Sequence, residues 1–360
     1  MKSAVCHSFG AELEVEDVAI RRPDSDEVLV SIAACAICHS DVAFIEGAWG
    51  GTLPAVYGHE AAGIVEEVGA DVAGLRRGDR VVVTLMRSCG KCQRCLQSRP
   101  ALCEGSAAWS QDTVLRTRGG APIHQGMRTA GFAEQVTVHS SQVVEVPADV
   151  PLESASLLAC GVLTGVGAVT NTAALEPGST AIVLGVGGVG LNCVQGASLA
   201  GAGAVVAVDV AARKLEVAAS FGASHTVDAS VDDVRESVLQ LTSGRGADYV
   251  FVAAGLSSLV EDGVGMLRRG GTLVIVGLPP SGATVALDPL AIADGSLRIL
   301  GSKMGDSVPQ RDIPKLVDLY RSGRLKLDEL ISGRYELERI NEAIASSKRG
   351  EQLRPVVVFS

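Results

Sequence analysis

Short apolar segments alternate with turn residues in the first part of the chain, up to about residue 160. Two of these segments, residues 28–34 and 80–84, are rich in Val and Ile and are bounded by Pro, Gly and Asp. β-Branched residues suit the pleated surface of a sheet, and the bounding residues are typical of turns. The pattern predicts a compact β-rich domain with functional loops.

The pattern of apolar segments changes near residue 161. Apolar runs typical of buried strands, such as residues 181–184 and 204–209, alternate with helical stretches such as residues 213–221. The two kinds of segment differ in the period of their apolar positions. Regular alternation of strand and helix predicts a doubly wound parallel sheet.

The last part of the chain begins near residue 303. It holds two amphipathic helical segments and a final apolar strand at residues 355–359, and we expect it to rejoin the first domain. The expected fold class is therefore α/β. One β-rich domain would comprise residues 1–160 and 303–360, and a second domain would comprise residues 161–302.

Length and charge narrow the range of partners. The chain has 360 residues, and 41 acidic against 31 basic side chains give a formal net charge of −10. A negative protein has no electrostatic attraction for nucleic acid or for an anionic membrane. No apolar run reaches the roughly 18 residues of a spanning helix, and the N-terminus lacks the apolar core of a secretory signal. We therefore expect a cytoplasmic protein with a small-molecule substrate and neither a nucleic-acid nor a membrane partner.

A glycine-rich turn, GVGGVG, follows a strand-like run and precedes a helical stretch. The spacing of Gly185, Gly187 and Gly190 allows a tight turn, close approach of a pyrophosphate, and packing of helix on strand, respectively. Asp209 closes the next strand about 20 residues later, where a carboxylate binds the adenosine ribose and repels a 2′-phosphate. The pattern predicts NAD rather than NADP. Lys214 either adds a ribose or phosphate contact or is a solvated helix charge.

Four cysteines fall in one short loop, SCGKCQRCLQSRPALC. Their thiolates can close a tetrahedron around zinc and leave no coordination site for chemistry; these residues are Cys89, Cys92, Cys95 and Cys103. In a reducing compartment, clustered cysteines bind metal more often than they form disulfides. Buried free thiols and an iron–sulfur cluster are the alternatives, but nothing in the chain indicates a redox partner. We expect a structural zinc that stabilises a lobe at about residues 87–105.

A second candidate donor set is spread over three segments. Cys38 lies in ACAICHSD, His59 and Glu60 lie in YGHEAAG, and Cys160 lies in ACGVLTG. Two thiolates and one imidazole would hold zinc with one open position, the ligand set of a catalytic zinc that binds an alcohol. Each residue alone is weak evidence, because a lone Cys is usually a small buried hydrophobe.

The segment GHEAAGIVEEVG, from Gly58 to Gly69, resembles the signature of the zinc-containing medium-chain dehydrogenases, the alcohol dehydrogenase family. The four-cysteine loop, the Cys38 and Cys160 segments and the GVGGVG turn occur in the order of that family. The resemblance therefore covers essentially the whole chain. It implies a GroES-like catalytic domain, discontinuous in sequence, around a Rossmann-fold NAD domain.

The resemblance also implies the roles of single residues. The ligands of the catalytic zinc would be Cys38, His59 and Cys160. Glu60 would assist ligand exchange, Asp41 would orient His59, and Ser40 would take the proton of the alcohol and pass it toward the ribose. The nicotinamide neighbours and turn contacts would be Thr164, Gly185, Gly187, Gly188, Val189, Gly190, Val276, Gly277 and Leu278. The pyrophosphate contacts would be His39 and Arg354.

Two positions depart from the family pattern. In horse-liver-type enzymes the proton relay ends in a His five positions after the first ligand Cys. Here that position is Ala43, so the proton would leave through the ribose and water or through another base. His39 stands where the family has Arg, which would make cofactor binding weaker and pH-sensitive.

These inferences predict reversible hydride transfer between a primary or aromatic alcohol and NAD, giving the aldehyde, with two zinc ions per chain. Sugar and polyol dehydrogenases of the family tend to carry Glu in the place of Cys160. One alternative is a thiol-dependent formaldehyde dehydrogenase, with candidate carrier anchors at Arg116, Arg118 and Arg128. The other is a non-catalytic or quinone-reductase-like protein of the same fold.

Two further expectations concern assembly and substrate. The long segment between Cys103 and Cys160 resembles that of the dimeric family members, so we expect a homodimer. It would be joined through the strand near Ile299 and Leu300. The shape of the substrate pocket is expected to depend on Trp49, Trp109, Leu115 and Leu300.

Overall fold

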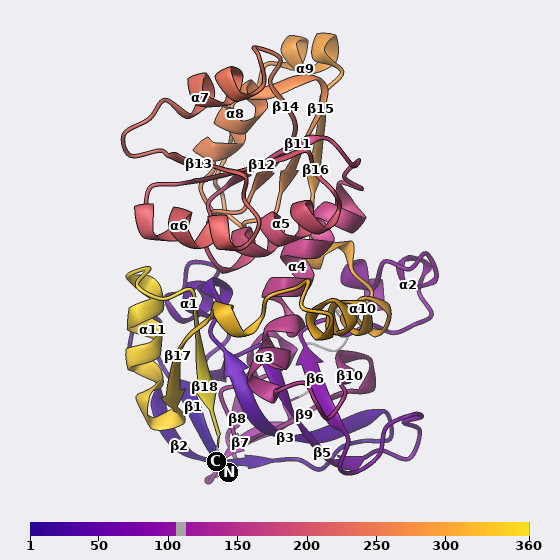
Figure 1. Cartoon of the computed structure of the whole chain (residues 1–360). Helices are drawn as coiled ribbons and strands as arrows, with labels where there is room; N and C mark the ends of the chain where they lie inside the picture. Colours follow the sequence, from indigo (N-terminus) through magenta and orange to yellow (C-terminus); the bar gives the residue numbers. More distant parts are fainter. Residues whose placement is uncertain (106–112, 360) are drawn as a thin grey trace. The chain divides into compact units, whose positions relative to one another are not determined.

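The computed structural model describes residues 1–105 and 113–359. The chain divides into two compact units (Figure 1). Unit 1 comprises Met1–Gly161 and Val308–Ser360, and unit 2 comprises Val162–Ser307. The second boundary lies later than the expected residue 302, because residues 304–307 bind to the first helices of unit 2. Asn171 Nδ2 donates to the Gly305 carbonyl at 3.1 Å, and Ser307 Oγ donates to the Leu163 carbonyl at 3.3 Å.

Unit 1 is built mainly of strands. Its larger sheet has seven strands among the described residues, in the order β10 (Val143–Glu145), β6 (Arg80–Thr84), β5 (Glu60–Val68), β3 (Glu27–Ala36), β18 (Arg354–Val358) and β17 (Ile331–Glu336), with β9 (Gln135–His139) also paired to β3. A closed barrel is formed by β1 (Lys2–Cys6), β2 (Glu14–Ile20), β7 (Leu115–Thr117), β8 (Pro122–Gln125) and β4 (Ala55–Val56). The antiparallel pairing of β18 with β3 brings the C-terminal segment into this unit.

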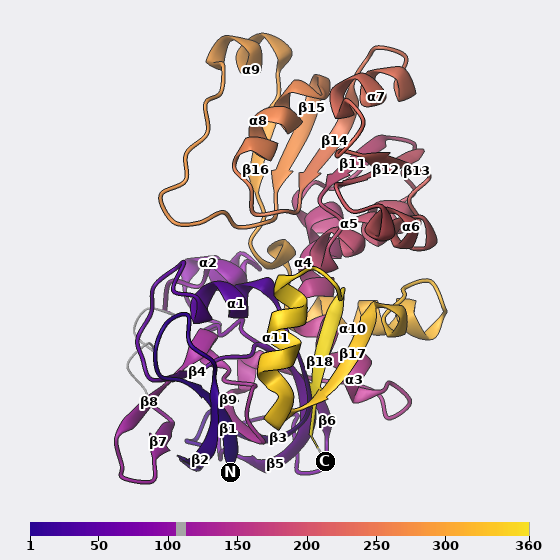
Figure 2. The same ribbon diagram turned by 90° about the vertical axis from the view of Figure 1, so that its left-hand side faces the viewer.

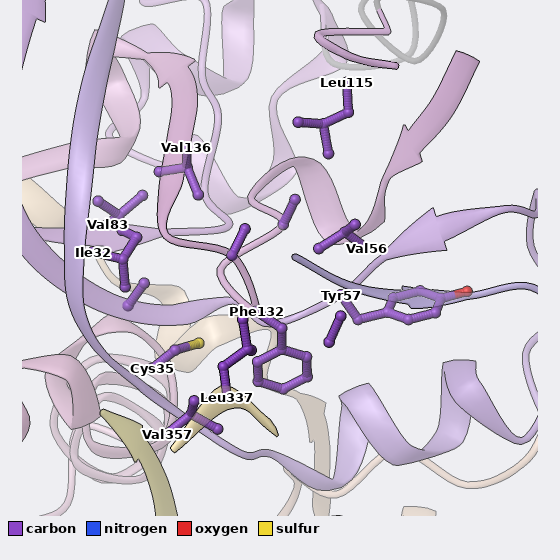
Figure 3. Close-up of a cluster of buried hydrophobic side chains, with 14 of the residues drawn as sticks. Ile32, Cys35, Val56, Tyr57, Val83, Leu115, Phe132, Val136, Leu337 and Val357 are labelled. Carbon is purple, nitrogen blue, oxygen red and sulfur yellow. The ribbon is translucent and has the colours of Figure 1, made fainter. Parts of the chain in front are cut away.

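The described α-helices of unit 1 vary in length from 4 to 13 residues. They are α1 (His39–Ile45), α2 (Gln93–Leu96), α3 (Leu152–Ser156), α10 (Pro309–Arg321) and α11 (Ile340–Lys348). Helix α11 contacts β17 and β18, as Figure 2 shows, and α3 contacts β3, β5 and β6. The buried core joins both strand systems and the C-terminal segment, with Phe132 near its centre (Figure 3). Leu115 belongs to this core and is 1% exposed, so the expectation that it shapes a substrate pocket is wrong.

Unit 2, all of whose residues are described, contains a six-stranded parallel sheet. The strand order is β13 (His225–Asp228), β12 (Ala204–Asp209), β11 (Thr180–Leu184), β14 (Ala247–Val252), β15 (Leu267–Ile275) and β16 (Arg298–Gly301). This is the order of a Rossmann fold, and it reverses between β11 and β14. The predicted α/β class, with a β-rich domain and a doubly wound parallel sheet, is confirmed.

Helices connect the strands of unit 2 along the chain. After α4 (Gly161–Gly167) come α5 (Gly188–Leu199), α6 (Ala212–Ser220), α7 (Val234–Leu241), α8 (Ser258–Gly265) and α9 (Pro289–Gly295). Helix α5 contacts β11, β12 and β14, whereas α8 contacts β14 and β15. The buried strand positions are mostly Val, Ile and Leu, including Ile182 and Val250. Such nearly continuous apolar runs are typical of parallel strands covered on both faces.

In residues 1–105 and 113–359, no single helix is long and apolar enough to cross a membrane. The bent pair Leu152–Ala159 and Gly161–Thr172 meets the length and composition criteria only when both helices are taken together.

Candidate active site

Unit 1 brings together four donor groups from three distant segments. Ligand atoms of Cys38, His59, Glu60 and Cys160 all lie within 4.8 Å of one another, and all four residues are buried. Cys38 is the N-cap of α1, and Glu60 begins β5 directly after His59. Cys160 follows a short helical turn whose last carbonyl, that of Ala159, accepts a hydrogen bond from Thr84 Oγ1 at 2.7 Å. These elements fix a compact donor cluster.

Asp41 connects two of the three segments. Its Oδ2 accepts from the Cys38 backbone N–H at 3.0 Å, and its Oδ1 accepts from the Gly58 N–H at 2.9 Å. Oδ1 also lies 3.0 Å from His59 Nδ1, which must donate because a carboxylate only accepts. The side chains of Asp41 and His59 are both 0% exposed. The contact fixes the ring orientation of His59.

The remaining ring nitrogen of His59 fits a metal. Nε2 is buried and has no hydrogen-bond partner among the described residues, although buried polar atoms are normally paired. With Nδ1 carrying the proton, Nε2 offers a lone pair toward the two sulfurs. A hydrogen bond with Cys160 holds the pKa of the Cys38 thiol well below its ordinary value, which favours the thiolate that binds metal. Two sulfurs, one imidazole and a nearby carboxylate suit zinc.

Glu60 is paired with a residue that the sequence assigned elsewhere. Arg354 Nη1 lies 3.1 Å from Glu60 Oε1 and donates to the Ile37 carbonyl at 3.3 Å. Burial raises the pKa of Glu60 to about 8, whereas the charge of Arg354 acts in the opposite direction. A Cβ on Gly161 would lie 1.7 Å from Arg354 Nη2, so a side chain at that position would displace the guanidinium. Sequence reasoning missed this ion pair, and the pyrophosphate role of Arg354 stays a prediction.

The four-cysteine loop also forms a compact donor set. The sulfurs of Cys89, Cys92, Cys95 and Cys103 lie within 4.8 Å of one another, and every cysteine of the chain is free of disulfides. Backbone N–H groups point at these sulfurs: Cys92 N donates to Cys89 Sγ and Cys89 N donates to Cys103 Sγ, each at 3.3 Å. Backbone donors lower the pKa of Cys92 to about 6. Four thiolates supported by N–H donors fit a structural zinc.

In unit 2 the glycines of the GVGGVG turn have different structural roles. Gly185 has φ +87°, which a side chain rarely adopts. A Cβ on Gly190 would lie 1.9 Å from the Gly185 carbonyl oxygen, so this position needs glycine for packing. A Cβ on Gly187 would meet nothing within 4 Å. Because α5 begins at Gly188, the open space lies at a helix N-terminus, where a phosphate is stabilised.

Asp209 ends β12 next to this turn. Its Oδ2 accepts from Val186 N at 2.9 Å, and its Oδ1 accepts from Ala211 N at 3.1 Å. Lys214 Nζ lies 3.8 Å from Oδ1. The carboxylate therefore stabilises the turn through backbone hydrogen bonds, in addition to any contact with a ribose. The sequence analysis did not predict this structural role.

The other predicted site residues are distributed over both units. His39 is exposed and Ser40 is half-buried at the start of α1. In unit 2, Thr164 is buried and its Oγ1 donates to Met304 Sδ at 3.7 Å. Val276 and Gly277 follow β15 and both donate their N–H to the Val252 carbonyl, whereas Leu278 is exposed. Val189, in the first turn of α5, is half-buried. Trp109 lies outside the described residues.

Comparison with known proteins agrees with this geometry. The family model of the alcohol dehydrogenase GroES-like domain matches residues 24–148, and that of the zinc-binding dehydrogenases matches residues 188–322. Together the two matches span well over half of the chain. The chain belongs to the zinc-containing medium-chain dehydrogenase family.

Relatives of this dehydrogenase cover its whole length. An NDMA-dependent alcohol dehydrogenase from Amycolatopsis methanolica is 37% identical, over 100% of this chain and 99% of the relative. A geraniol dehydrogenase from Castellaniella defragrans is 34% identical, over 99% of this chain and 97% of the relative. The crystal structure of benzyl alcohol dehydrogenase from Acinetobacter calcoaceticus superposes with a TM-score of 0.94 at 32% identity, over 100% of this chain and 99% of the other. These similarities identify an oxidoreductase of the alcohol dehydrogenase type.

Proposed function

We propose that this dehydrogenase uses zinc and NAD to interconvert a primary or aromatic alcohol and its aldehyde. The observation that carries the proposal is the buried cluster of Cys38, His59, Glu60 and Cys160, with the His59 Nε2 lone pair left without a protein partner. Cys160 occupies the third ligand position, where sugar and polyol enzymes of the family tend to have Glu. The donor set therefore favours simple or aromatic alcohols.

The residues of unit 1 would hold the metal and move the proton. Cys38, His59 and Cys160 would bind zinc, and Asp41 would keep the His59 ring in its ligating orientation. A zinc ion bound there would act as a Lewis acid and make the hydroxyl proton of the alcohol more acidic. Ser40 Oγ, two residues after Cys38, would accept this proton. Because Ala43 carries no titratable group, the proton would continue from Ser40 to the ribose and water.

The residues of unit 2 would bind the dinucleotide. The open space at Gly187 leaves room for the pyrophosphate at the N-terminus of α5. The carboxylate of Asp209 would accept hydrogen bonds from the ribose hydroxyls and would repel a 2′-phosphate, which favours NAD. The nicotinamide would supply the carbon that accepts hydride.

Metal content and turnover test the proposal together. We expect about two zinc ions per chain and oxidation of benzyl alcohol with NAD. Cys38→Ala should abolish turnover and remove one zinc while NAD binding, measured by fluorescence titration, persists. Cys193→Ala, at a buried cysteine of α5 outside both clusters, is the matched control and should keep both metals. Full activity of Cys38→Ala would remove this residue from the metal site.

A second candidate differs only in the final electron acceptor. The relative from Amycolatopsis methanolica is named for dependence on NDMA, and it is 37% identical to this chain. In this alternative, alcohol oxidation would require NDMA as an added acceptor. Multiple turnovers with NAD alone would favour the first candidate, and turnover only after NDMA is added would favour the second.

The thiol-dependent formaldehyde reaction has less support. Arg118 pairs with Asp17, and Arg116 donates to the Gly120 carbonyl on an exposed turn. Two of the three candidate anchors therefore have local partners. We expect turnover of simple alcohols without an added thiol, and a strict thiol requirement would reverse this assignment.

We also propose a homodimer joined along β16. This strand ends the order of the six-stranded sheet, so its outer edge has no partner strand within unit 2. An unpaired edge is a template for pairing with a second copy. Light scattering should give twice the chain mass, and a monomer at all concentrations would refute the assembly.

A further inference from the structure

Unit 1 contains a cavity of about 220 Å³ whose aromatic wall comes from the segments that carry the metal donors. Phe44 lies one turn after Ser40 on α1, so both residues share a helix face. Tyr57 lies two residues before His59. The rings of Phe44 and Tyr57 stack with centroids 5.8 Å apart, and Trp49 meets Phe44 edge-on at 5.2 Å. The cavity is thus lined by aromatic rings beside the proposed catalytic segments.

Gly126 allows the Tyr57 ring to occupy this place. A Cβ at position 126 would lie 2.4 Å from Tyr57 Cδ1. Met127 adds a flexible apolar surface to the lining. For scale, a cavity of roughly 150 Å³ holds one benzene ring. The available volume therefore suits one aromatic ring with a small substituent.

The described lining holds several hydrogen-bond donors and no carboxylate. The Tyr57 side chain is buried, at 2% exposure, and its hydroxyl has no hydrogen-bond partner among the described residues. Arg87 and Arg128 also line the cavity, whereas no Asp or Glu belongs to the described lining. A ligand in this cavity meets the Tyr57 hydroxyl and two guanidinium groups, besides the side chains of Thr52, His124 and Gln125.

The backbone beside Arg128 adopts an uncommon conformation. Met127, Arg128 and Ala130 have φ values of +49°, +60° and +59°. Non-glycine residues in this region concentrate at functional sites, where the surroundings hold them in place. Here the Gln125 side-chain amide donates to the Thr129 carbonyl at 3.2 Å. The strained turn brings Arg128 into the lining near Arg87, and both burial and the positive charge of Arg87 lower the pKa of Arg128.

We propose that this cavity binds the ring of the substrate and selects aryl alcohols that carry a carboxylate. The ring would lie against Phe44, Tyr57 and Met127. The carboxylate would accept hydrogen bonds from Tyr57 and Arg128, and the carbinol group would remain for the metal donors. This assignment rests on the proposed alcohol dehydrogenase function, and it names the class of substrate.

The test compares two alcohols that differ at one ring position, para-(hydroxymethyl)benzoate and para-methylbenzyl alcohol. In the wild type, the carboxylate-bearing alcohol should have a kcat/KM about tenfold or more above that of the methyl-bearing alcohol. Tyr57→Phe and Arg128→Gln should each reduce this ratio about tenfold, because each removes one donor to the carboxylate. Arg116→Gln removes an exposed arginine of the same unit and should keep the wild-type ratio. Equal kcat/KM values for both alcohols in the wild type would overturn the proposal.

A binding measurement separates this proposal from the proposed function. The ligand para-methylbenzoate lacks the alcohol, and calorimetry with the zinc-loaded protein should show binding that weakens about tenfold in Arg128→Gln but not in Arg116→Gln. If such binding occurs while no alcohol is oxidised, the proposed function fails and the cavity assignment stands. If alcohols are oxidised but para-methylbenzoate binds independently of Arg128, the cavity assignment fails and the function stands.

Discussion

Replacement of Asp41 by Asn tests the support of the metal site with little change in size. The two carboxylate oxygens of Asp41 accept three hydrogen bonds from buried N–H groups, on Cys38, Gly58 and His59. An Asn side chain has one oxygen and one NH₂ group. In either orientation at least one buried N–H would face another donor. The substitution therefore leaves a buried group unsatisfied whichever way the amide points.

The expected magnitude follows from these contacts. An unsatisfied buried donor costs about 1–3 kcal/mol. Loss of a hydrogen bond that orients a metal-binding His typically reduces metal affinity about 10- to 100-fold. We therefore expect Asp41→Asn to bind the zinc of the Cys38 cluster about 10- to 100-fold more weakly, whereas the zinc of the four-cysteine loop keeps its affinity.

Zinc release to a coloured chelator measures both sites in one experiment. The wild type should release two zinc ions in separate phases. The phase that is missing in Cys38→Ala belongs to the zinc of the Cys38 cluster, and only this phase should accelerate in Asp41→Asn. Asp17→Asn is the control, because it removes an exposed carboxylate of the same unit that pairs with Arg118. Unchanged release of the Cys38-cluster zinc would show that Asp41 does not support His59, and the reasoning from its hydrogen bonds would be wrong.

Three other outcomes are expected. Gly187→Ala should fold normally, because its Cβ meets no protein atom, but it should bind NAD weakly because the Cβ enters the space proposed for the pyrophosphate. Gly190→Ala should lower Tm, because its Cβ would overlap the Gly185 carbonyl. Equal Tm values for the two variants in a thermal melt would contradict this contrast. Asp209→Ala should lower the ratio of NAD to NADP affinity at least about tenfold. It should also weaken the binding of NAD, since Val186 N loses its acceptor. An unchanged ratio in nucleotide titrations would mean that another group recognises the ribose. The pKa of Asp312 lies below its ordinary value of 3.8, because hydrogen bonds from Arg311 outweigh the opposite effect of burial. The carboxylate therefore contributes stability above pH 4, and this stability is lost as the pH falls through the folded-state pKa. Denaturant unfolding should accordingly show Asp312→Asn about 1–2 kcal/mol less stable at pH 7, with a difference that shrinks below pH 4.

The features that the sequence predicted well have local determinants. The glycines of the GVGGVG turn act within one strand–turn–helix unit, and their distinct tasks can be read from their spacing. The four cysteines of the structural cluster lie in one loop, so thiolate chemistry and short spacing suffice to bring them together. The Rossmann sheet was also predictable, because each buried strand and each helix carries its own apolar period.

Distant contacts were harder to predict. Only the family resemblance joined Cys160 to Cys38 and His59, since spacing alone cannot show which segments meet in the folded chain. Leu115 was expected to shape the substrate pocket. In the structure it pairs with Ile20 and Ile123 in the barrel, where its side chain is buried in the core. A strand residue can face either side of a sheet, and the short β7 segment does not show a clear alternation.

The pairing of Arg354 with Glu60 has a physical reason that only the assembled site reveals. The charge of Arg354 favours the ionised form of Glu60. In that form, Glu60 and the thiolates of Cys38 and Cys160 would place three negative charges in a buried cluster, which two positive charges of zinc cannot balance alone. Arg354, 4% exposed, supplies the third positive charge. Removing one member of a buried ion pair usually costs several kcal/mol, because the other charge stays unpaired. Gly161, next to Cys160, then has a clear role, since a side chain there would occupy the space of the guanidinium that neutralises the metal donors.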